Sequence, residues 1–163
     1  MRISLRALGA AACAYLAGAA LGADAPLPRP LDQASADSMA ERCFAGSHAN
    51  SWPPFTIAVV DTGGALLLLR REDGASPVTA DAALLKARTA ARSGAPTQAL
   101  VAMSQDSPTR DLLLLLQLTD DPGGIPIKAG GRVIGAIGVS GGSAEQDVGC
   151  ANLGLAVLNG EKK

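Results

Sequence analysis

The sequence predicts an α+β fold, in which one antiparallel sheet is flanked by helices within a single domain. β-Branched and aliphatic residues gather in short runs, and these runs come in pairs separated by turn residues. Segments with helical spacing lie before, between and after the pairs. Strands grouped in hairpins, rather than alternating singly with helices, favour an antiparallel sheet over a parallel one, and we expect about five strands.

A helix is predicted before the first hairpin. It begins at Asp32, whose carboxylate can accept hydrogen bonds from the free backbone N–H groups of the first turn. It ends at Gly46, because glycine readily terminates a helix. His48 therefore falls in the loop 47–54.

Two hairpins follow along the chain. The first pairs residues 55–60 with residues 66–71 through the turn sequence Asp-Thr-Gly-Gly, in which Asp61 is interpreted as a structural turn residue. The second pairs residues 123–128 with residues 132–140 through a Gly-Gly turn.

Helices fill the interval between the hairpins and end the chain. Residues 79–93 carry alanines along one narrow face, which allows close approach to the sheet. Residues 97–103 and 109–118 are helical by propensity, and the second segment contains the five consecutive leucines 112–116. A helix that is apolar on all sides must be covered by the core or by a second subunit. The last helix follows Gly141-Gly142-Ser143.

The first 23 residues have the pattern of a secretory signal peptide. Arg2 and Arg6 precede a small and apolar run over residues 7–21, which is shorter than the roughly 20 residues that a membrane-spanning helix needs. We expect cleavage after Ala23 and a periplasmic or secreted protein without a membrane segment. The alternative is an uncleaved N-terminal anchor.

Cleavage would divide the chain into a signal peptide (1–23), a proline-rich extended leader (24–30) and one domain (31–160). Removing the two signal-peptide arginines from 14 basic residues leaves 12 against 15 acidic ones, a net charge of −3. This balance argues against a nucleic-acid or anionic-membrane surface, because such surfaces are bound by clustered basic residues.

Two cysteines, Cys43 and Cys150, remain after Cys13 leaves with the signal peptide. Export would place them in an oxidising compartment, where thiol pairs tend to form disulfides. We expect a Cys43–Cys150 disulfide, and the alternative is two unpaired thiols packed in the core.

Three groups of segments, in order along the chain, resemble one family. They are Ile-Ala-Val-Val-Asp-Thr-Gly-Gly at 57–64, Arg-Glu-Asp-Gly-Ala at 71–75 with Lys-Ala-Arg-Thr-Ala at 86–90, and Gly-Gly-Ile-Pro-Ile at 123–127 through Gly-Ala-Ile-Gly-Val-Ser-Gly-Gly at 135–142. Together they resemble the GlcG/HbpS family, also called the haem-degrading-domain family. The resemblance covers residues 31–158, nearly the whole chain after the signal peptide.

The resemblance implies a profilin-like domain that forms homo-oligomers, and haem as the ligand, since several members bind haem. It also implies that the first and last helices lie near one another, which would support the Cys43–Cys150 pairing. A tetrapyrrole or another small molecule is then the expected ligand, and a periplasmic dehydrogenase or a sensor protein is the expected protein partner.

Six residues are candidates for ligand contact: His48, Asp73, Lys86, Gly141, Gly142 and Ser143. The glycines and Ser143 would present backbone N–H groups at a helix start, which suits a haem propionate or a small organic acid. Alternatively they form only a tight turn with Ser143 as the helix cap. Lys86 would pair with a ligand carboxylate or extend to solvent. Asp73 would edge the ligand site, as the family match suggests, or form a turn with Gly74.

His48 is the candidate axial ligand to haem iron. Covalent haem attachment would need Cys-x-x-Cys-His, which the sequence lacks. Axial ligands are usually His, Met, Cys or Tyr, and besides His48 the exported chain offers Met39, Met103 and the two cysteines. The alternative is that His48 is a solvated loop residue.

The sequence therefore favours an exported haem- or tetrapyrrole-binding protein with a carrier or sensor-accessory role. We predict no catalytic residue and no dedicated metal site, because one histidine and scattered carboxylates form neither a nucleophile–base pair nor a metal ligand set. The alternatives are an accessory protein or enzyme of small hydroxy-acid or alcohol oxidation in the periplasm, haem degradation, and a purely structural role.

Overall fold

Two hairpins form the sheet, and they lie where the sequence predicts them. The computed structural model describes residues 29–159, so the signal peptide, its cleavage site and most of the leader lie outside the described residues. The elements are α1 (Gln33–Ala49), β1 (Thr56–Asp61), β2 (Leu66–Arg71), α2 (Val78–Ser93), the 3-10 turn η1 (Thr97–Leu100), α3 (Val101–Ser104), α4 (Ser107–Leu115), β3 (Gly124–Ala129), β4 (Arg132–Ser140), α5 (Ala144–Leu155) and the 3-10 turn η2 (Ala156–Asn159).

The inner strands of the two hairpins join them into one antiparallel sheet. β1 pairs with β4 from Thr56 opposite Ser140 to Asp61 opposite Gly135, and the strand order is β2-β1-β4-β3. The predicted α+β fold is confirmed. The sheet has four strands rather than about five, because the two predicted hairpins supply all of its strands and residues 97–115 are helical, as the sequence predicts.

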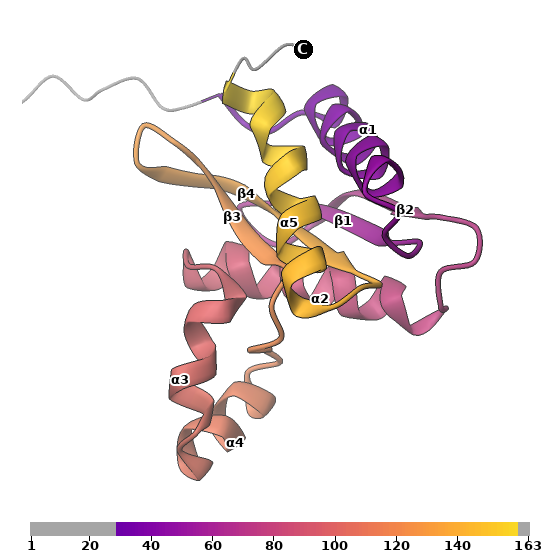
Figure 1. Cartoon of the computed structure of the whole chain (residues 1–163). Helices are drawn as coiled ribbons and strands as arrows, with labels where there is room; N and C mark the ends of the chain where they lie inside the picture. The colour runs from indigo at the N-terminus through magenta and orange to yellow at the C-terminus, as the bar shows by residue number, and fades with distance from the viewer. Residues whose placement is uncertain (1–28, 160–163) are drawn as a thin grey trace, which may run out of the picture.

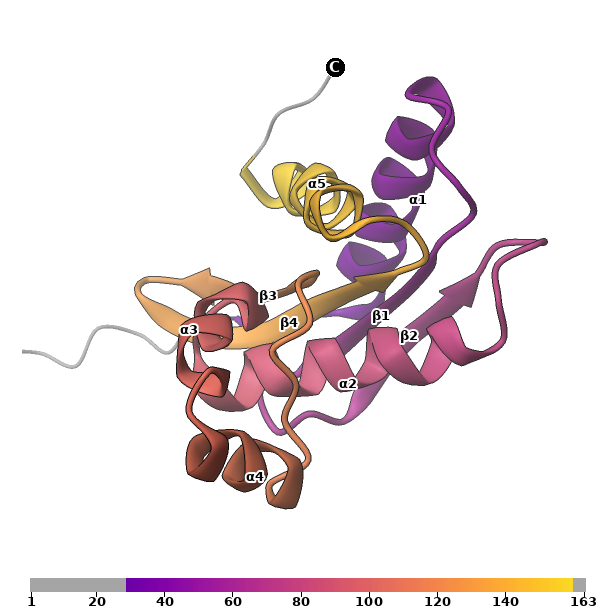
Figure 2. The same ribbon diagram turned by 60° about the horizontal axis from the view of Figure 1, so that its bottom comes forward.

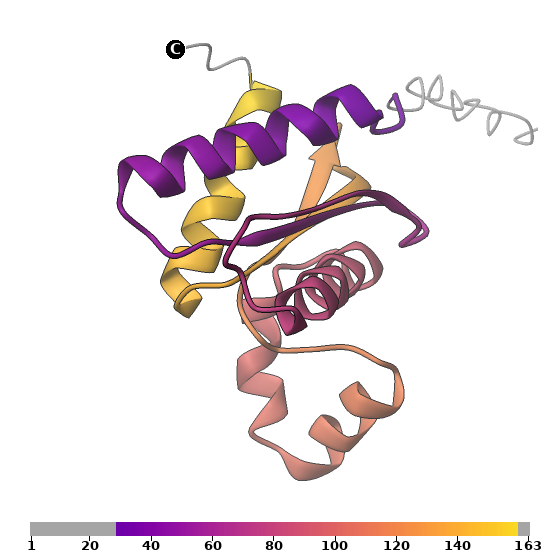
Figure 3. The ribbon, with the colours of Figure 1, turned by 90° about the vertical axis from the view of Figure 1, so that its right-hand side faces the viewer.

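Helices cover both faces of the sheet, as Figures 1 and 3 show: α1 and α5 lie on one face and α2 on the other. β1 contributes side chains to the core on both faces of the sheet, because successive side chains of a strand point to opposite faces. Ile57 and Val59 pack with α1 and α5, whereas Ala58 and Val60 pack with the alanines of α2. This central strand is therefore buried on both sides.

The small-residue face of α2 lies directly on the sheet, as its sequence predicts. Ala83, Ala87 and Ala90 are fully buried. Opposite them β4 carries Gly138, where an added Cβ would collide with the Ala83 carbonyl oxygen and lie 2.5 Å from the Ala87 nitrogen. Backbone rather than side chain thus fills the contact between α2 and β4.

The first helix begins as predicted but ends later. The Asp32 carboxylate accepts a hydrogen bond from the Ser35 N–H at 2.8 Å. The helix continues past Gly46 and ends before Ser51, which has φ 54°. Gly46 instead makes room for α5, since a Cβ there would lie 2.5 Å from Leu153 Cδ1. As a result His48 lies in the last turn of α1 and not in a loop.

A disulfide between Cys43 and Cys150 joins α1 to α5, with the two Cα atoms 4.7 Å apart. Both cysteines are fully buried among the apolar side chains of that layer. The bridge holds together the two helices that share one face of the sheet.

The segment from η1 to α4 projects away from the sheet beyond α2, as Figures 1 and 2 show. We call this segment, residues 97–116, the arm. Of the five leucines at its end only Leu113 is buried, so the domain core does not cover the predicted apolar helix. No helix within residues 29–159 is both long and apolar enough to cross a bilayer.

Candidate functional site

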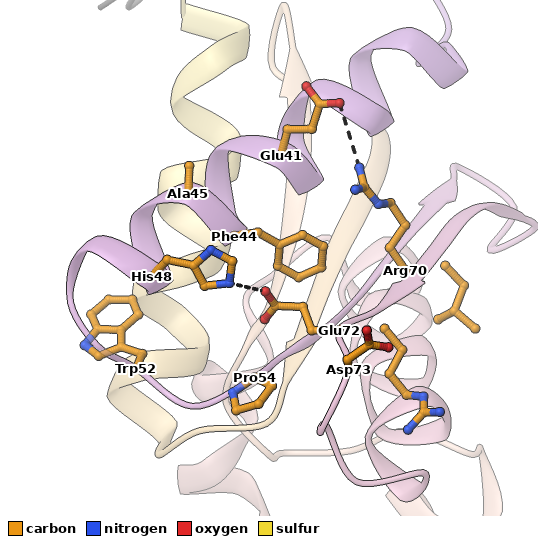
Figure 4. Close-up of a pocket in the computed structure, with 11 residues that line it drawn as sticks. Glu41, Phe44, Ala45, His48, Trp52, Pro54, Arg70, Glu72 and Asp73 are labelled. Atoms are coloured by element: carbon orange, nitrogen blue, oxygen red, sulfur yellow. Dashed lines mark hydrogen bonds and ion pairs between the residues drawn. The ribbon is translucent and has the colours of Figure 1, made fainter.

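A pocket of about 960 Å³ opens between the end of α1, the loop that follows it and the end of β2 (Figure 4). Its lining combines two aromatic rings, two arginines, three carboxylates and the chain's single histidine. The lining residues are Glu41, Phe44, Ala45, His48, Trp52, Pro54, Leu69, Arg70, Arg71, Glu72 and Asp73. Two of the predicted ligand contacts, His48 and Asp73, therefore come together here.

His48 is held at the pocket by Glu72. Its Nε2 lies 2.5 Å from Glu72 Oε1, and Figure 4 shows the imidazole directed at this carboxylate. The other oxygen of Glu72, Oε2, accepts a hydrogen bond from the Phe55 N–H at 2.8 Å. The Glu72 side chain is only 12% exposed, against 69% for His48. A carboxylate fixed by the sheet thus orients an imidazole that remains open to the pocket.

The backbone explains why Glu72 is so well placed. Its own N–H donates to the Phe55 carbonyl at 3.0 Å, which extends the β1–β2 ladder by one step. Main chain and side chain of Glu72 therefore both bind Phe55. In the neutral imidazole, Nε2 donates its proton to the carboxylate and Nδ1 keeps its lone pair.

Aromatic and cationic groups form the walls. The Arg70 guanidinium lies 5.4 Å from the centre of the Phe44 ring, a cation–π arrangement. One of its nitrogens is 3.9 Å from Glu41, which is largely exposed. Trp52 contacts Phe55 edge to face, with 6.3 Å between ring centres. The pocket accordingly offers apolar surface with a cation at its border.

Lys86 lies outside this pocket, and its buried side chain extends from α2 to the start of α5. Its ammonium contacts Asp147 Oδ2 at 2.7 Å and Asp121 Oδ2 at 2.8 Å, and its side chain is 2% exposed. The lysine does not extend to solvent, because two carboxylates of the chain neutralise it inside. Burial raises the pKa of Asp147, and its hydrogen bond with Lys86 acts against this.

The backbone N–H groups at the start of α5 donate to side chains of the same helix. The Gly142 N–H donates to Asp147 Oδ1 at 2.9 Å, and the Ser143 N–H donates to Gln146 Oε1 at 2.9 Å. Ser143 also caps the helix by accepting from the Gln146 N–H. Gly141, with φ 150°, passes close to the Phe55 backbone. This geometry favours the alternative of a tight capped turn over an anion site at Gly141-Gly142-Ser143.

Other candidate iron ligands lie away from the pocket. Met39 is fully buried in the core, and both cysteines of the described part of the chain are in the disulfide. Met103 is 50% exposed, but it belongs to α3 in the arm. Within residues 29–159 no three His, Cys, Asp or Glu side chains gather as a metal site. His48 is thus the one usual haem ligand that lines the pocket.

Sequence reasoning missed Glu72, Phe44 and Arg70 as site residues. Glu72 lies within the Arg-Glu-Asp-Gly-Ala segment that carries the family resemblance, and this was the available signal. Its pairing with His48, 24 positions away, depends on the ladder between β1 and β2.

Comparison with known proteins gives a consistent result. The family model described as haem degrading protein HbpS-like matches residues 31–156. Protein GlcG of Escherichia coli K12 is 41% identical over 91 residues, which are 56% of this chain and 66% of GlcG.

Two solved structures share the fold. HbpS from Streptomyces reticuli, crystallised as a double mutant, is 32% identical and has a TM-score of 0.73, covering 92% of this chain and 99% of its own. A structure described as a PduOC:heme complex is 25% identical with a TM-score of 0.74, covering 80% and 96%.

Proposed function

The chain belongs to the HbpS-like family of haem-degrading proteins, and from this premise we propose that it binds haem in the pocket between α1 and β2, outside the cytoplasm. The observation that carries the proposal is the position of His48. Its imidazole is accessible at the pocket, and its Nε2 is already held by the Glu72 carboxylate. A carboxylate partner is the usual companion of a metal-bound histidine, because it fixes the ring and raises its basicity.

The pocket suits a haem in size and chemistry. A volume of about 960 Å³ lies at the upper end of the range for cofactor sites. Phe44 and Trp52 offer aromatic surface to a flat apolar macrocycle. Arg70 suits a propionate carboxylate, since guanidinium groups bind carboxylates in a planar, bidentate manner. The His48 imidazole would hold the haem iron, and the bound haem would supply a redox-active centre.

The relatives support the same ligand. One neighbour of the same fold is described as a haem complex, and the family is described by haem degradation. We propose binding as the activity of this chain, because the pocket offers an oriented imidazole and a cationic border, as a haem-binding site requires.

Export is proposed on two observations. The N-terminal sequence has the basic and apolar regions of a signal peptide. The buried Cys43–Cys150 disulfide is typical of oxidising compartments. Mass spectrometry of protein recovered from the periplasm or medium should give a chain that begins at Asp24. Recovery of the intact chain in the cytoplasm would overturn this part of the proposal.

Hemin titration tests the binding. The wild-type protein should give a saturable, shifted Soret band, and His48→Ala should weaken binding at least about tenfold. Met103→Ala is the matched control and should bind as the wild type does, because it removes the one partly exposed thioether among residues 29–159, which lies on α3 away from the pocket. A wild-type spectrum equal to that of hemin with a non-binding protein would refute the proposal. Loss of the band with release of iron, after addition of reductant and oxygen, would show degradation instead.

A further inference from the structure

Trp52 borders the pocket from the loop that follows α1 (Figure 4). It is the single tryptophan of the chain. Its indole also packs against α5, where a Cβ added at Gly149 would lie 2.9 Å from Trp52 Cη2 and 3.4 Å from Trp52 Cζ3. The missing side chain at Gly149 therefore leaves the space that the indole occupies.

The helix itself gives no reason for a glycine at position 149. Gly149 lies in the interior of α5, where glycine is less favourable than alanine. Its φ is not left-handed, so the backbone conformation does not require glycine. Apart from the backbone of α5 and the neighbouring residues, the three heavy atoms nearest to an added Cβ all belong to Trp52. Contact with the indole is thus the structural reason for this glycine.

Both partners of the contact are tied to α1. Cys150, which follows Gly149, forms the disulfide with Cys43 of α1. The Trp52 N–H donates to the Ser47 carbonyl of the same helix at 3.0 Å. Because these bonds hold α5 and the main chain of Trp52 in place, the indole ring is the part that must move when a larger residue stands at position 149.

A second glycine makes room for the ring that Trp52 contacts. The indole meets Phe55 edge to face, and a Cβ added at Gly142, in the turn before α5, would lie 2.8 Å from Phe55 Cε1. The Phe55 N–H in turn holds the Glu72 carboxylate. The glycines at the start of α5 and within it thus seat the two aromatic rings next to the pocket.

We propose that Gly149 is a positioning residue of the haem pocket, which fixes the Trp52 indole at the pocket wall and thereby sets the affinity for haem. This role rests on the function proposed above. Gly149 does not line the pocket and acts through the indole, which offers aromatic surface to the macrocycle. Displacement of the indole removes this contact and leaves the His48–Glu72 pair in place.

Hemin titration of Gly149→Ala tests this role. The added methyl group should displace the indole and weaken hemin binding by at least about fivefold, the scale of one aromatic contact. In the hemin-free protein the fluorescence of Trp52 should shift to longer wavelength, and acrylamide should quench it more, because the ring loses its contact with α5. Circular dichroism should be unchanged, since alanine favours the helix.

Gly154→Ala is the matched control. It adds the same methyl group to the same helix, but this Cβ would lie 2.9 Å from the Met39 carbonyl oxygen and 3.2 Å from Ile137 Cδ1, in the core. It should lower the melting temperature and leave both the Trp52 fluorescence and the hemin affinity as in the wild type. Equal changes of fluorescence and affinity in the two variants would overturn the role, because they would show a general disturbance of α5.

Trp52→Phe tests the coupling between the two residues. Phenylalanine lacks the outer ring atoms that the added methyl group would meet, so Trp52→Phe should weaken hemin binding, and Gly149→Ala should have no further effect in this background. Trp52→Phe adds no atom to α5, so it measures the contribution of the indole even where Gly149→Ala does not fold.

Three results would overturn the role of Gly149 alone, each with a wild type that binds hemin. They are an unchanged affinity in Gly149→Ala, an unchanged affinity in Trp52→Phe, and losses that simply add in the double variant. A wild type that binds no hemin would overturn the proposed function and this role with it, so the two failures are distinguishable.

Discussion

The His48 imidazole and the Glu72 carboxylate lie 2.5 Å apart and join the last turn of α1 to the residue that follows β2. Glu72 is also anchored by the Phe55 N–H, so the imidazole rests on the sheet through one acidic side chain. The orientation of the histidine is therefore a property of the fold and precedes any ligand.

Glu72→Gln should weaken hemin binding by about 10- to 100-fold, the usual effect of removing a carboxylate partner from a metal-bound histidine. The amide oxygen can still accept from the Phe55 N–H, so the fold should be retained. Hemin titration and thermal denaturation measure the two effects separately.

Glu41→Gln provides the matched control for Glu72→Gln. Glu41 lines the same pocket, but its side chain is 71% exposed and lies 3.9 Å from Arg70. Its loss should change hemin affinity less than about fivefold, since exposed ion pairs contribute about 0–1 kcal/mol. Equal effects of the two substitutions would show that Glu72 acts only through its charge and not through His48.

Lys86→Met should lower the free energy of unfolding by about 3–5 kcal/mol at pH 7, because it leaves the carboxylate of Asp147 buried without its cation. Asp147→Asn should cost less, since Lys86 retains Asp121 at 2.8 Å. Urea denaturation of the two variants measures both values. A smaller loss for Lys86→Met than for Asp147→Asn would contradict this order.

The decrease in the free energy of unfolding caused by Lys86→Met should become smaller as the pH falls from 7 towards 4. Burial already raises the pKa of Asp147 in the folded protein above the ordinary value of 3.8, and removing Lys86 removes an opposing influence. A carboxyl whose folded pKa exceeds its unfolded pKa binds its proton more tightly in the folded state. Its contribution to stability is therefore fully present below the unfolded pKa and is lost as the pH rises through the folded pKa. In Lys86→Met/Asp147→Asn this pH dependence should disappear.

Replacing the disulfide by Cys43→Ala/Cys150→Ala should lower the free energy of unfolding by about 2–5 kcal/mol, because the bridge closes a loop between positions 107 residues apart. Reductant should destabilise the wild type to a similar extent and leave the double variant unchanged. Thermal denaturation with and without reductant checks this. Equal melting temperatures in all four samples would mean that the bridge is not formed.

Gly138→Ala should destabilise the protein by at least about 2 kcal/mol, because its Cβ would collide with the α2 backbone at Ala83 and Ala87. Gly63→Ala is the matched control. Its Cβ would meet only Asp61 Oδ1, at an ordinary 3.4 Å, and its backbone is not left-handed. A melting temperature lowered equally by both would show that α2 can shift away from the sheet.

The sequence predicted the sheet well because strands are local patterns. The bounds of β2 and β4 follow from their aliphatic runs and turn glycines, and the alanine face of α2 identified the side that packs on the sheet. Gly46 was misread as a helix end, because the reason for that glycine is Leu153, more than 100 residues away. The expected count of about five strands was one too high, because the two hairpins located in the sequence supply all four strands of the sheet.

The candidate site was only partly predictable. His48 stood out as the single histidine, whereas Glu72 became its partner only through the β1–β2 ladder. Lys86 was predicted to pair with a ligand carboxylate or to extend to solvent, but its partners are Asp121 and Asp147 from distant segments of the chain. Pairings between charged residues far apart in the chain depend on the assembled fold and leave no local pattern.

Imidazole rescue of His48→Gly tests haem ligation by His48 most directly. The variant should bind hemin weakly, and added imidazole should restore the wild-type Soret maximum in a saturable manner by occupying the position of the missing side chain. The same imidazole titration of Met103→Ala should leave the protein's own Soret band in place. A His48→Gly variant that binds hemin with the wild-type affinity and spectrum, without imidazole, would contradict haem ligation by His48.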